Sequence, residues 1–147
     1  MIVIESSAII NKILFFFRWR GKESILMHIL IIEDDEFNQI VLHDMIKLQF
    51  PHVTLTVLAS AVEALQLEPF EFDLVLTDID MQTIDGFMLY DKLRNERHYK
   101  GPIIAVTALA VEGDREKILM HGFDDYISKP LSATILQQKL IPWIESH

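Results

Sequence analysis

The stretch HILIIEDDEFNQIVLHDMIKL, residues 28–48, contains the pattern on which the fold is built. Five mostly apolar residues, 28–32, form a candidate strand, and three acids at 33–35 follow at once. Apolar side chains then recur at helical spacing over residues 36–48. They are Phe37, Ile40, Val41, Met45 and Leu48. The stretch therefore predicts a strand, an acidic turn and a helix.

The same alternation recurs through the rest of the chain. Further strands are predicted at residues 53–58, 72–77, 102–106 and 126–128. Helices are predicted from Ser60 to before Pro69, and at residues 86–97, 111–121 and 132–144. Ser60 and Glu63 have the spacing of a capping box, which starts a helix, whereas Pro142 is expected to weaken the last helix near its end.

Three of the predicted strands, beginning at residues 28, 72 and 102, are largely apolar throughout, which favours a parallel sheet covered on both faces. The second strand alternates apolar residues with threonine and is expected at an edge. Right-handed crossovers then favour an α/β fold of the flavodoxin-like (βα)5 type. We expect a three-layer sandwich whose five-stranded parallel sheet has the order 2-1-3-4-5.

Length and composition limit the classes of function. The chain has 147 residues, no cysteine and a net charge of −9. This length predicts one domain. Without cysteine the chain has no disulfide framework, no thiol catalysis and no cysteine-ligated zinc. The acidic balance argues against direct binding of nucleic acid.

The charge is distributed unevenly. Residues 1–26 carry a net +2, and residues 27–147 carry −11 from 9 basic and 20 acidic side chains. Between residues 9 and 17 apolar side chains recur at helical spacing, but the run is too short to span a membrane. Its basic residues follow the apolar run, which is unlike a signal peptide. The segment is therefore either an amphipathic helix that binds a partner or a membrane surface, or a leader of unknown role outside a domain at 27–147.

Chemistry-bearing residues follow the predicted strands. In such sheets ligands bind at the carboxyl ends of the strands, here occupied by Glu33, Asp34, Asp78, Thr107 and Lys129. Neighbouring carboxylates raise one another's pKa unless a cation lies between them. Oxygen ligands favour Mg²⁺, with Mn²⁺ as a possible substitute. Asp78 can then act as a nucleophile that accepts a phosphoryl group, with Lys129 neutralising its charge and Thr107 hydrogen-bonding one of its oxygens.

Residues 28–145 resemble a response-regulator receiver domain of two-component signalling, of the single-domain, chemotaxis-regulator-like kind. Four motifs carry the resemblance, in the family's order and spacing. They are ILIIEDDEFN (29–38), DLVLTDIDMQTIDGF (73–87), PIIAVTALA (102–110) and GFDDYISKP (122–130).

The resemblance implies roles for individual residues. The metal would be held by Glu33, Asp34, Asp78 and the backbone carbonyl of Asp80. Tyr126 would act as a rotamer switch coupled to Thr107, and the Lys129–Pro130 bond would be cis.

The resemblance also implies partners. A sensor histidine kinase or a histidine phosphotransfer protein in the cytoplasm would donate the phosphoryl group. A downstream target would bind the face made by residues 111–121, 126–128 and 132–144. Because the last predicted helix ends near His147, we expect the protein to signal by binding another protein. Its only catalysis would be self-phosphorylation from small donors and self-dephosphorylation.

Two positions depart from the family pattern. Gln82 stands where proline is usual, which predicts a less rigid loop from Asp80 to Asp85. Asp80 adds a carboxylate beside the acceptor, and we expect it to change the lifetime of the phosphoryl group.

Other interpretations remain open. Asp35 can be only a helix cap, and Tyr126 can simply cover the sheet edge. The chain can be a pseudo-receiver that binds partners without being phosphorylated. LVLTDIDMQT also resembles the opening motif of haloacid-dehalogenase-like phosphatases, although that motif belongs on a first strand.

Overall fold

The computed structural model describes residues 26–109 and 111–146, so the prediction for residues 1–25 lies outside the described part. The strands are β1 (His28–Ile32), β2 (Thr54–Leu58), β3 (Leu74–Thr77), β4 (Ile103–Thr107) and β5 (Asp125–Ser128). The helices are α2 (Glu36–Gln49), α3 (Ala61–Gln66), α4 (Gly86–Asn95), α5 (Asp114–His121) and α6 (Ala133–Ile144). Each predicted strand and helix has its counterpart.

The strands form one parallel sheet in the order β2-β1-β3-β4-β5, which confirms the predicted fold class and topology. β2 lies at one edge, as its alternating sequence predicted, and β5 lies at the other. β1 lies between β2 and β3, and its last residue Ile32 is in register with Leu58 on one side and Thr77 on the other. The polar residues that follow β1 and β3 therefore emerge side by side.

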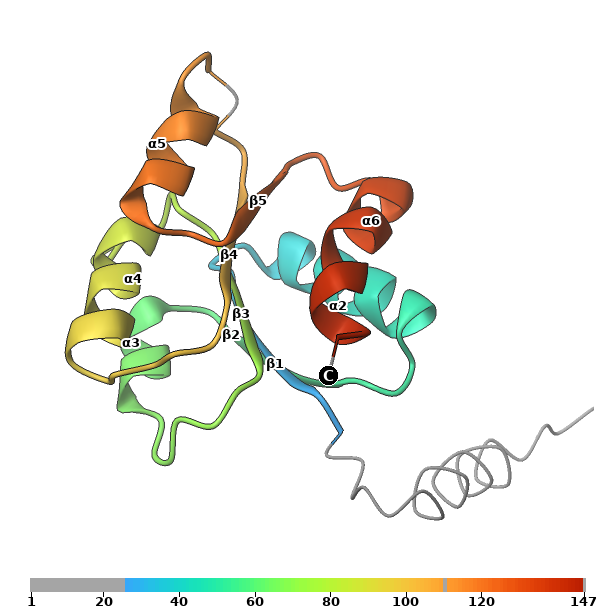
Figure 1. Cartoon of the computed structure of the whole chain (residues 1–147), viewed down its shortest axis with the longest axis horizontal. Coiled ribbons are helices and arrows are strands. Elements are labelled where there is room, and N and C mark those ends of the chain that lie inside the picture. Colours follow the sequence, from blue (N-terminus) through green and yellow to red (C-terminus); the bar gives the residue numbers. More distant parts are fainter. Residues whose placement is uncertain (1–25, 110, 147) are drawn as a thin grey trace, which may run out of the picture.

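Helices cover both faces of the sheet (Figure 1). α2 and α6 pack on one face over Ile29 and Ile31, whereas α3, α4 and α5 pack on the other over Leu30 and Ile32. Successive side chains of β1 thus enter two separate cores, which is why the strand is apolar at every position from 29 to 32.

α2 buries a different set of side chains from the one that its apolar spacing marked out. Leu42 and Ile46, one helical turn apart, enter the core. Phe37, Ile40 and Leu48 lie on the opposite side of the helix and are exposed. Apolar spacing identified the helix, but it did not identify the face that packs.

The start of α5 differs from the prediction, whereas α6 ends at the predicted residue. α5 begins at Asp114 instead of residue 111, because Gly113 has a φ of 96° in the left-handed region, which cannot continue a helix. α6 runs through Pro142 to Ile144. Pro142 lies in the last turn, where its missing N–H removes only one hydrogen bond, and Leu140 and Ile144 still pack in the core. Among the residues that the structure describes, none of the helices could cross a membrane.

Candidate functional site

The candidate site is built on the adjacent ends of β1 and β3. The amide of Asp78 donates to the carbonyl of Ile32 over 2.9 Å, and the amide of Glu33 donates to that of Leu58 over 3.0 Å. These ladder bonds extend the sheet by one residue on each strand. They fix Glu33 and Asp78 beside each other although 45 residues separate them in the chain.

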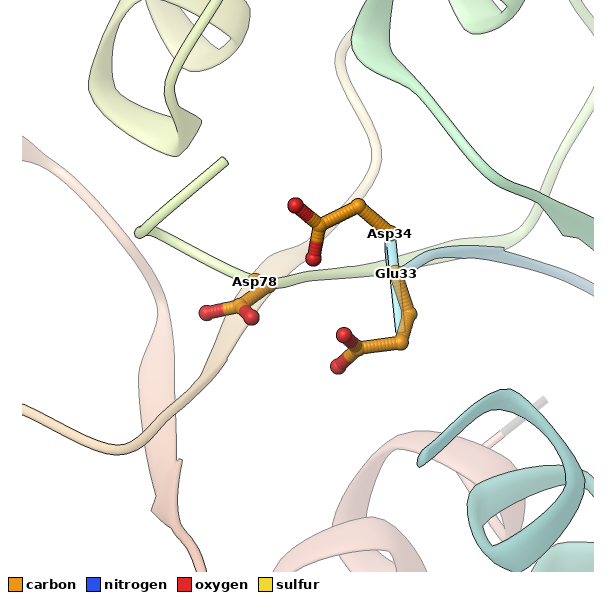
Figure 2. A group of neighbouring side chains, drawn as sticks. All are labelled: Glu33, Asp34 and Asp78. Atoms are coloured by element: carbon orange, nitrogen blue, oxygen red, sulfur yellow. The ribbon is translucent and has the colours of Figure 1, made fainter. Parts of the chain in front are cut away.

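Three carboxylates gather at this edge (Figure 2). Glu33, Asp34 and Asp78 each offer an oxygen, and these oxygens lie within 4.8 Å of one another. Glu33 and Asp78 are only 2% and 6% exposed, whereas Asp34 faces solvent. A cluster of this kind, open on one side, can receive a cation from solution.

Lys129 reaches the cluster from the end of β5. Its Nζ donates to Oε2 of Glu33 over 2.5 Å and to Oδ2 of Asp78 over 2.9 Å. Burial alone would lower the pKa of Lys129, but the hydrogen bonds and charges of Glu33 and Asp78 outweigh burial and raise it. The ammonium is thus held charged between two buried acids. The Lys129–Pro130 bond that follows is cis, as the resemblance implied, and Glu68–Pro69 is a second cis bond that the sequence did not suggest.

Backbone groups orient the two buried acids. Oδ1 of Asp78 accepts from the amides of Ile79 over 2.7 Å and Asp80 over 3.2 Å. Oε1 of Glu33 accepts from the amide of Asp35 over 3.1 Å. Burial nevertheless raises the pKa of the Glu33 carboxyl, against the lowering by Lys129 and the Asp35 amide. The negative charge at the site is therefore only partly compensated by the protein's own groups.

The donor set fits a hard divalent cation. One ammonium faces three carboxylates, and every candidate ligand atom is a carboxylate oxygen, which suits Mg²⁺ better than softer metals. The side chain of Asp80 is exposed and is not among the clustered acids. The structure places the amide of Asp80 on Asp78, and the use of its carbonyl as a ligand stays a prediction.

Thr107 and Tyr126 lie on the two strands beyond β3. Thr107 is buried at the end of β4, where its Oγ1 accepts from the amide of Leu109 over 3.2 Å instead of bonding to the acids. Tyr126 is half-buried on β5, with Arg115 of α5 and Lys139 of α6 at 5.8 and 5.2 Å from its ring centre. It is thus in contact with both helices that flank β5.

Two of the acids near the site cap helices. Asp35 accepts from the amide of Asn38 over 2.8 Å at the start of α2, and Asp85 accepts from that of Met88 over 2.8 Å at the start of α4. Asp35 is therefore the helix cap that its position in a turn suggested. Ser60 caps α3 by accepting from the amide of Glu63, as the capping-box spacing predicted.

Sequence reasoning missed two supporting residues. The side-chain amide of Gln39 donates to the carbonyl of Glu33 over 2.7 Å and so fixes the turn that carries the acids. Gly86 lies so close to the acceptor that an added Cβ would come within 2.4 Å of the carbonyl oxygen of Asp78. The Asp85-Gly86 pair was a signal for the second, whereas nothing local marks Gln39.

A cavity of about 410 Å³ opens beside Asp34. Its walls come from the turn after β1, the loop after β2 with the start of α3, and the loop after β3. They are Asp34, Ala59, Ser60, Val62, Met81, Gln82 and Thr83. Gln82 thus stands on a cavity wall at the position where the family usually has proline, and Thr83 next to it has a φ of 68°.

The fold and the acidic site together define a sheet protein of the receiver type, and comparison with known families agrees. The family model described as the response regulator receiver domain matches residues 29–141. The chain belongs to the response regulator receiver domain family, the receiver domains of two-component systems. This membership favours the receiver over the phosphatase interpretation of LVLTDIDMQT.

Curated relatives include whole regulators and parts of kinases. The chain is 36% identical over 106 residues to the polar-differentiation response regulator DivK of Brucella ovis, covering 71% of this chain and 85% of DivK. It is 39% identical over 88 residues to the sensor histidine kinase GacS of Pseudomonas protegens. That match covers 57% of this chain but only 9% of GacS.

A solved structure gives the same fold with a metal. The receiver domain of sensor histidine kinase PA1611 from Pseudomonas aeruginosa PAO1 has a TM-score of 0.69 and 34% identity, covering 81% of this chain and 98% of that one. It holds a magnesium ion in its active-site cleft. The chemotaxis protein CheY4 of Vibrio cholerae shares the fold at a TM-score of 0.69 and 21% identity, covering 80% of this chain and 98% of that one.

Proposed function

We propose that Asp78 accepts a phosphoryl group from a phosphohistidine of a sensor histidine kinase or histidine phosphotransfer protein. The observation that carries this proposal is the placement of Asp78, which is buried, oriented by two amides and paired with Lys129. A carboxylate oxygen of Asp78 forms the new bond to phosphorus as the bond from phosphorus to the histidine nitrogen breaks. The ammonium of Lys129 compensates the charge of the transferred group.

Glu33, Asp34, Asp78 and the backbone carbonyl of Asp80 are the proposed ligands of Mg²⁺, for which Mn²⁺ can substitute. The clustered oxygens within 4.8 Å support this set. When bound, the cation would supply positive charge for the phosphoryl oxygens. The protein's own contribution is to hold these oxygens at the ends of two hydrogen-bonded strands.

Thr107 and Tyr126 are the proposed switch residues. The hydroxyl of Thr107 would leave the Leu109 amide to bond a phosphoryl oxygen, and Tyr126 would turn inward. Because Tyr126 contacts Arg115 of α5 and Lys139 of α6, its movement would remodel the face made by α5, β5 and α6. A downstream target protein would recognise that face.

The same proposal places the receiver domain at residues 27–147 and in the cytoplasm, where its kinase partner would present phosphohistidine. The start of β1 at His28 and the family match from residue 29 support this boundary. The role of the protein is that of a switch, with self-phosphorylation from small donors and self-dephosphorylation as its only catalysis. Direct binding of nucleic acid is not part of the proposed function.

Incubation with Mg²⁺ and acetyl phosphate, followed by mass spectrometry, tests the central step. We expect a single phosphoryl adduct that maps to Asp78 and is absent from Asp78→Asn. Glu71→Gln, which removes one exposed acid near the opposite end of β3, is the matched control and should be labelled like the parent. An unlabelled parent would favour the pseudo-receiver, and equal labelling of Asp78→Asn would show that the acceptor is another residue.

A further inference from the structure

α2 presents an apolar stripe to solvent. Phe37 is 72% exposed, Ile40 55% and Leu48 83%, and all three lie on the side of the helix away from Leu42 and Ile46. These three residues are called the α2 stripe below. Large apolar side chains gathered on one helical face are typical of a surface that another chain segment covers.

The chain enters the domain at the end where α2 finishes. Met27 is buried in the same core as Ile46 and Phe50, at the carboxyl end of α2, and its carbonyl accepts from the amide of Thr54 over 2.8 Å. Leu48 lies in the last turn of α2. Any segment that precedes Met27 therefore starts at the end of the domain where α2 ends, on the core side of that helix.

The preceding sequence contains a segment whose apolar side chains need a partner. Residues 9–17 carry seven large apolar side chains, and all but Phe15 recur at helical spacing. Those at helical spacing are Ile9, Ile10, Ile13, Leu14, Phe16 and Phe17. Phe37 and Leu48 are about 17 Å apart along the helix at 1.5 Å per residue. Residues 18–26 can extend over about 30 Å, so residues 9–17 can reach the whole stripe.

Charge also matches between the segment and the stripe. Residues 1–26 carry +2, with Lys12 inside the apolar segment. The exposed acids of α2 are Glu36 and Asp44, and Asp44 falls on the same helical face as the stripe. Lys47 of α2 is engaged with the carbonyl of Val53 over 2.7 Å, and Oδ1 of Asp44 lies 2.9 Å from Nδ1 of His43, so Oδ2 of Asp44 is the oxygen that a basic residue would meet. A basic residue in an apolar segment would thus meet an acid in an apolar stripe.

We propose that residues 9–17 dock on the α2 stripe of the same molecule. A tether of nine residues gives an effective concentration in the millimolar range, which favours this segment over a second copy at micromolar concentration. Because α2 begins directly after Asp34 and Asp35, the docked segment covers the face of the domain that adjoins the acidic site. The inference goes beyond the proposed function and does not depend on phosphorylation of Asp78.

Trp19 lies close to the segment and reports docking. The chain has two tryptophans, so Trp143→Phe leaves Trp19 as the only one among its 147 residues. We expect the Stern–Volmer constant for acrylamide quenching of Trp19 to rise at least about twofold in Ile40→Asp, because a charge in the stripe releases the docked segment and exposes Trp19 to the quencher. Met120→Asp, on the exposed surface of α5, is the matched control and should leave quenching unchanged.

A second variant keeps the test valid if Ile40→Asp fails to fold. Ile13→Asp changes the segment itself, outside the family match at 29–141, and should raise quenching to the same level while the far-UV circular dichroism of the folded domain is retained. Equal quenching in the parent, Ile40→Asp and Ile13→Asp would overturn the proposal. Protection that appears only as protein concentration rises would overturn it too, because a second copy would then be the occupant.

Discussion

At the scale of single residues, Glu33 and Asp78 illustrate how a site keeps charge buried. Each is almost fully enclosed, and each shares the ammonium of Lys129 and accepts at least one backbone hydrogen bond. Buried charges without such partners would cost several kcal/mol each. Asp80, in contrast, is exposed, and its carboxylate is free to act on whatever is bound at Asp78.

Asp80→Asn is expected to change the rate of dephosphorylation of Asp78 by about twofold to fivefold, the effect of roughly 0.5–1 kcal/mol from one exposed charge. A slower rate would mean that the carboxylate positions the hydrolytic water, and a faster one that it acts by repelling the phosphoryl anion. A time course of the phosphorylated protein in Mg²⁺ measures it, with Glu71→Gln as the charge-matched control. An unchanged rate would remove Asp80 from the account of phosphoryl lifetime.

Tyr99 is a second residue with a testable charge state. Its pKa is raised because burial disfavours the charged phenolate; Arg94 opposes this effect, and the charges of Asp73 and Asp124 add to it. Above about pH 10 the unfolded chain therefore loses this proton before the folded protein does, and stability falls with rising pH by up to about 1.4 kcal/mol per pH unit.

Tyr99→Phe should remove that loss. Denaturant unfolding from about pH 9 to about pH 11 measures the free energy of unfolding of both proteins. As pH rises, we expect the value for Tyr99→Phe to increase relative to that of the parent. A difference that is constant over this range would contradict the raised pKa.

At the scale of elements, the start of α4 is positioned by a backbone contact with the acceptor loop. The amide of Gly86 donates to the carbonyl of Ile79 over 2.9 Å, and Asp85 caps the helix. A Cβ at residue 86 would approach the carbonyl oxygen of Asp78 to 2.4 Å and Cα of Ile79 to 2.7 Å. Only glycine fits between a helix start and a loop that are this close.

Gly86→Ala should therefore destabilise the protein by about 1–3 kcal/mol, because backbone atoms cannot move aside as a flexible side chain can. It should also lower the rate of phosphorylation of Asp78, because the clash falls on the acceptor's own carbonyl. Denaturant unfolding and the acetyl phosphate assay measure the two effects. Asn95→Ala, an exposed change at the other end of α4, is the control, and equal stability of the two variants would refute the close approach.

At the scale of the whole molecule, the −11 charge of residues 27–147 is only partly used by the site. Three acids gather at the carboxyl edge of the sheet, and a divalent cation there would bind the folded chain and not the unfolded one. Melting in Mg²⁺ is thus a test of the site as an assembled unit.

We expect Mg²⁺ to stabilise the protein by about 2.7 kcal/mol at a hundredfold excess over its dissociation constant. Asp34→Asn should abolish this gain with little effect on folding, because Asp34 is exposed. Thermal melts with and without Mg²⁺ measure it, and Glu71→Gln should retain the shift. A shift that persists in Asp34→Asn would place the cation elsewhere.

The sequence by itself determined the order of strands and helices and the class of the fold. Periodicity is a local property, so the apolar runs at β1, β3 and β4 and the capping pattern of Ser60 and Glu63 could be interpreted directly. The acids directly follow predicted strands in the sequence. Because parallel strands end at the same edge of a sheet, this position predicted that the acids lie at the carboxyl edge.

Only the tertiary structure decided which atoms meet. Lys129 and Glu33 are 96 residues apart, and their 2.5 Å contact depends on the register of the strands between them. The role of Gln39 and the exposure of Phe37, Ile40 and Leu48 likewise depend on how α2 is rotated against the sheet. That rotation is set by packing of Leu42 and Ile46 with residues distant in the chain, so the local periodicity of the sequence does not predict it.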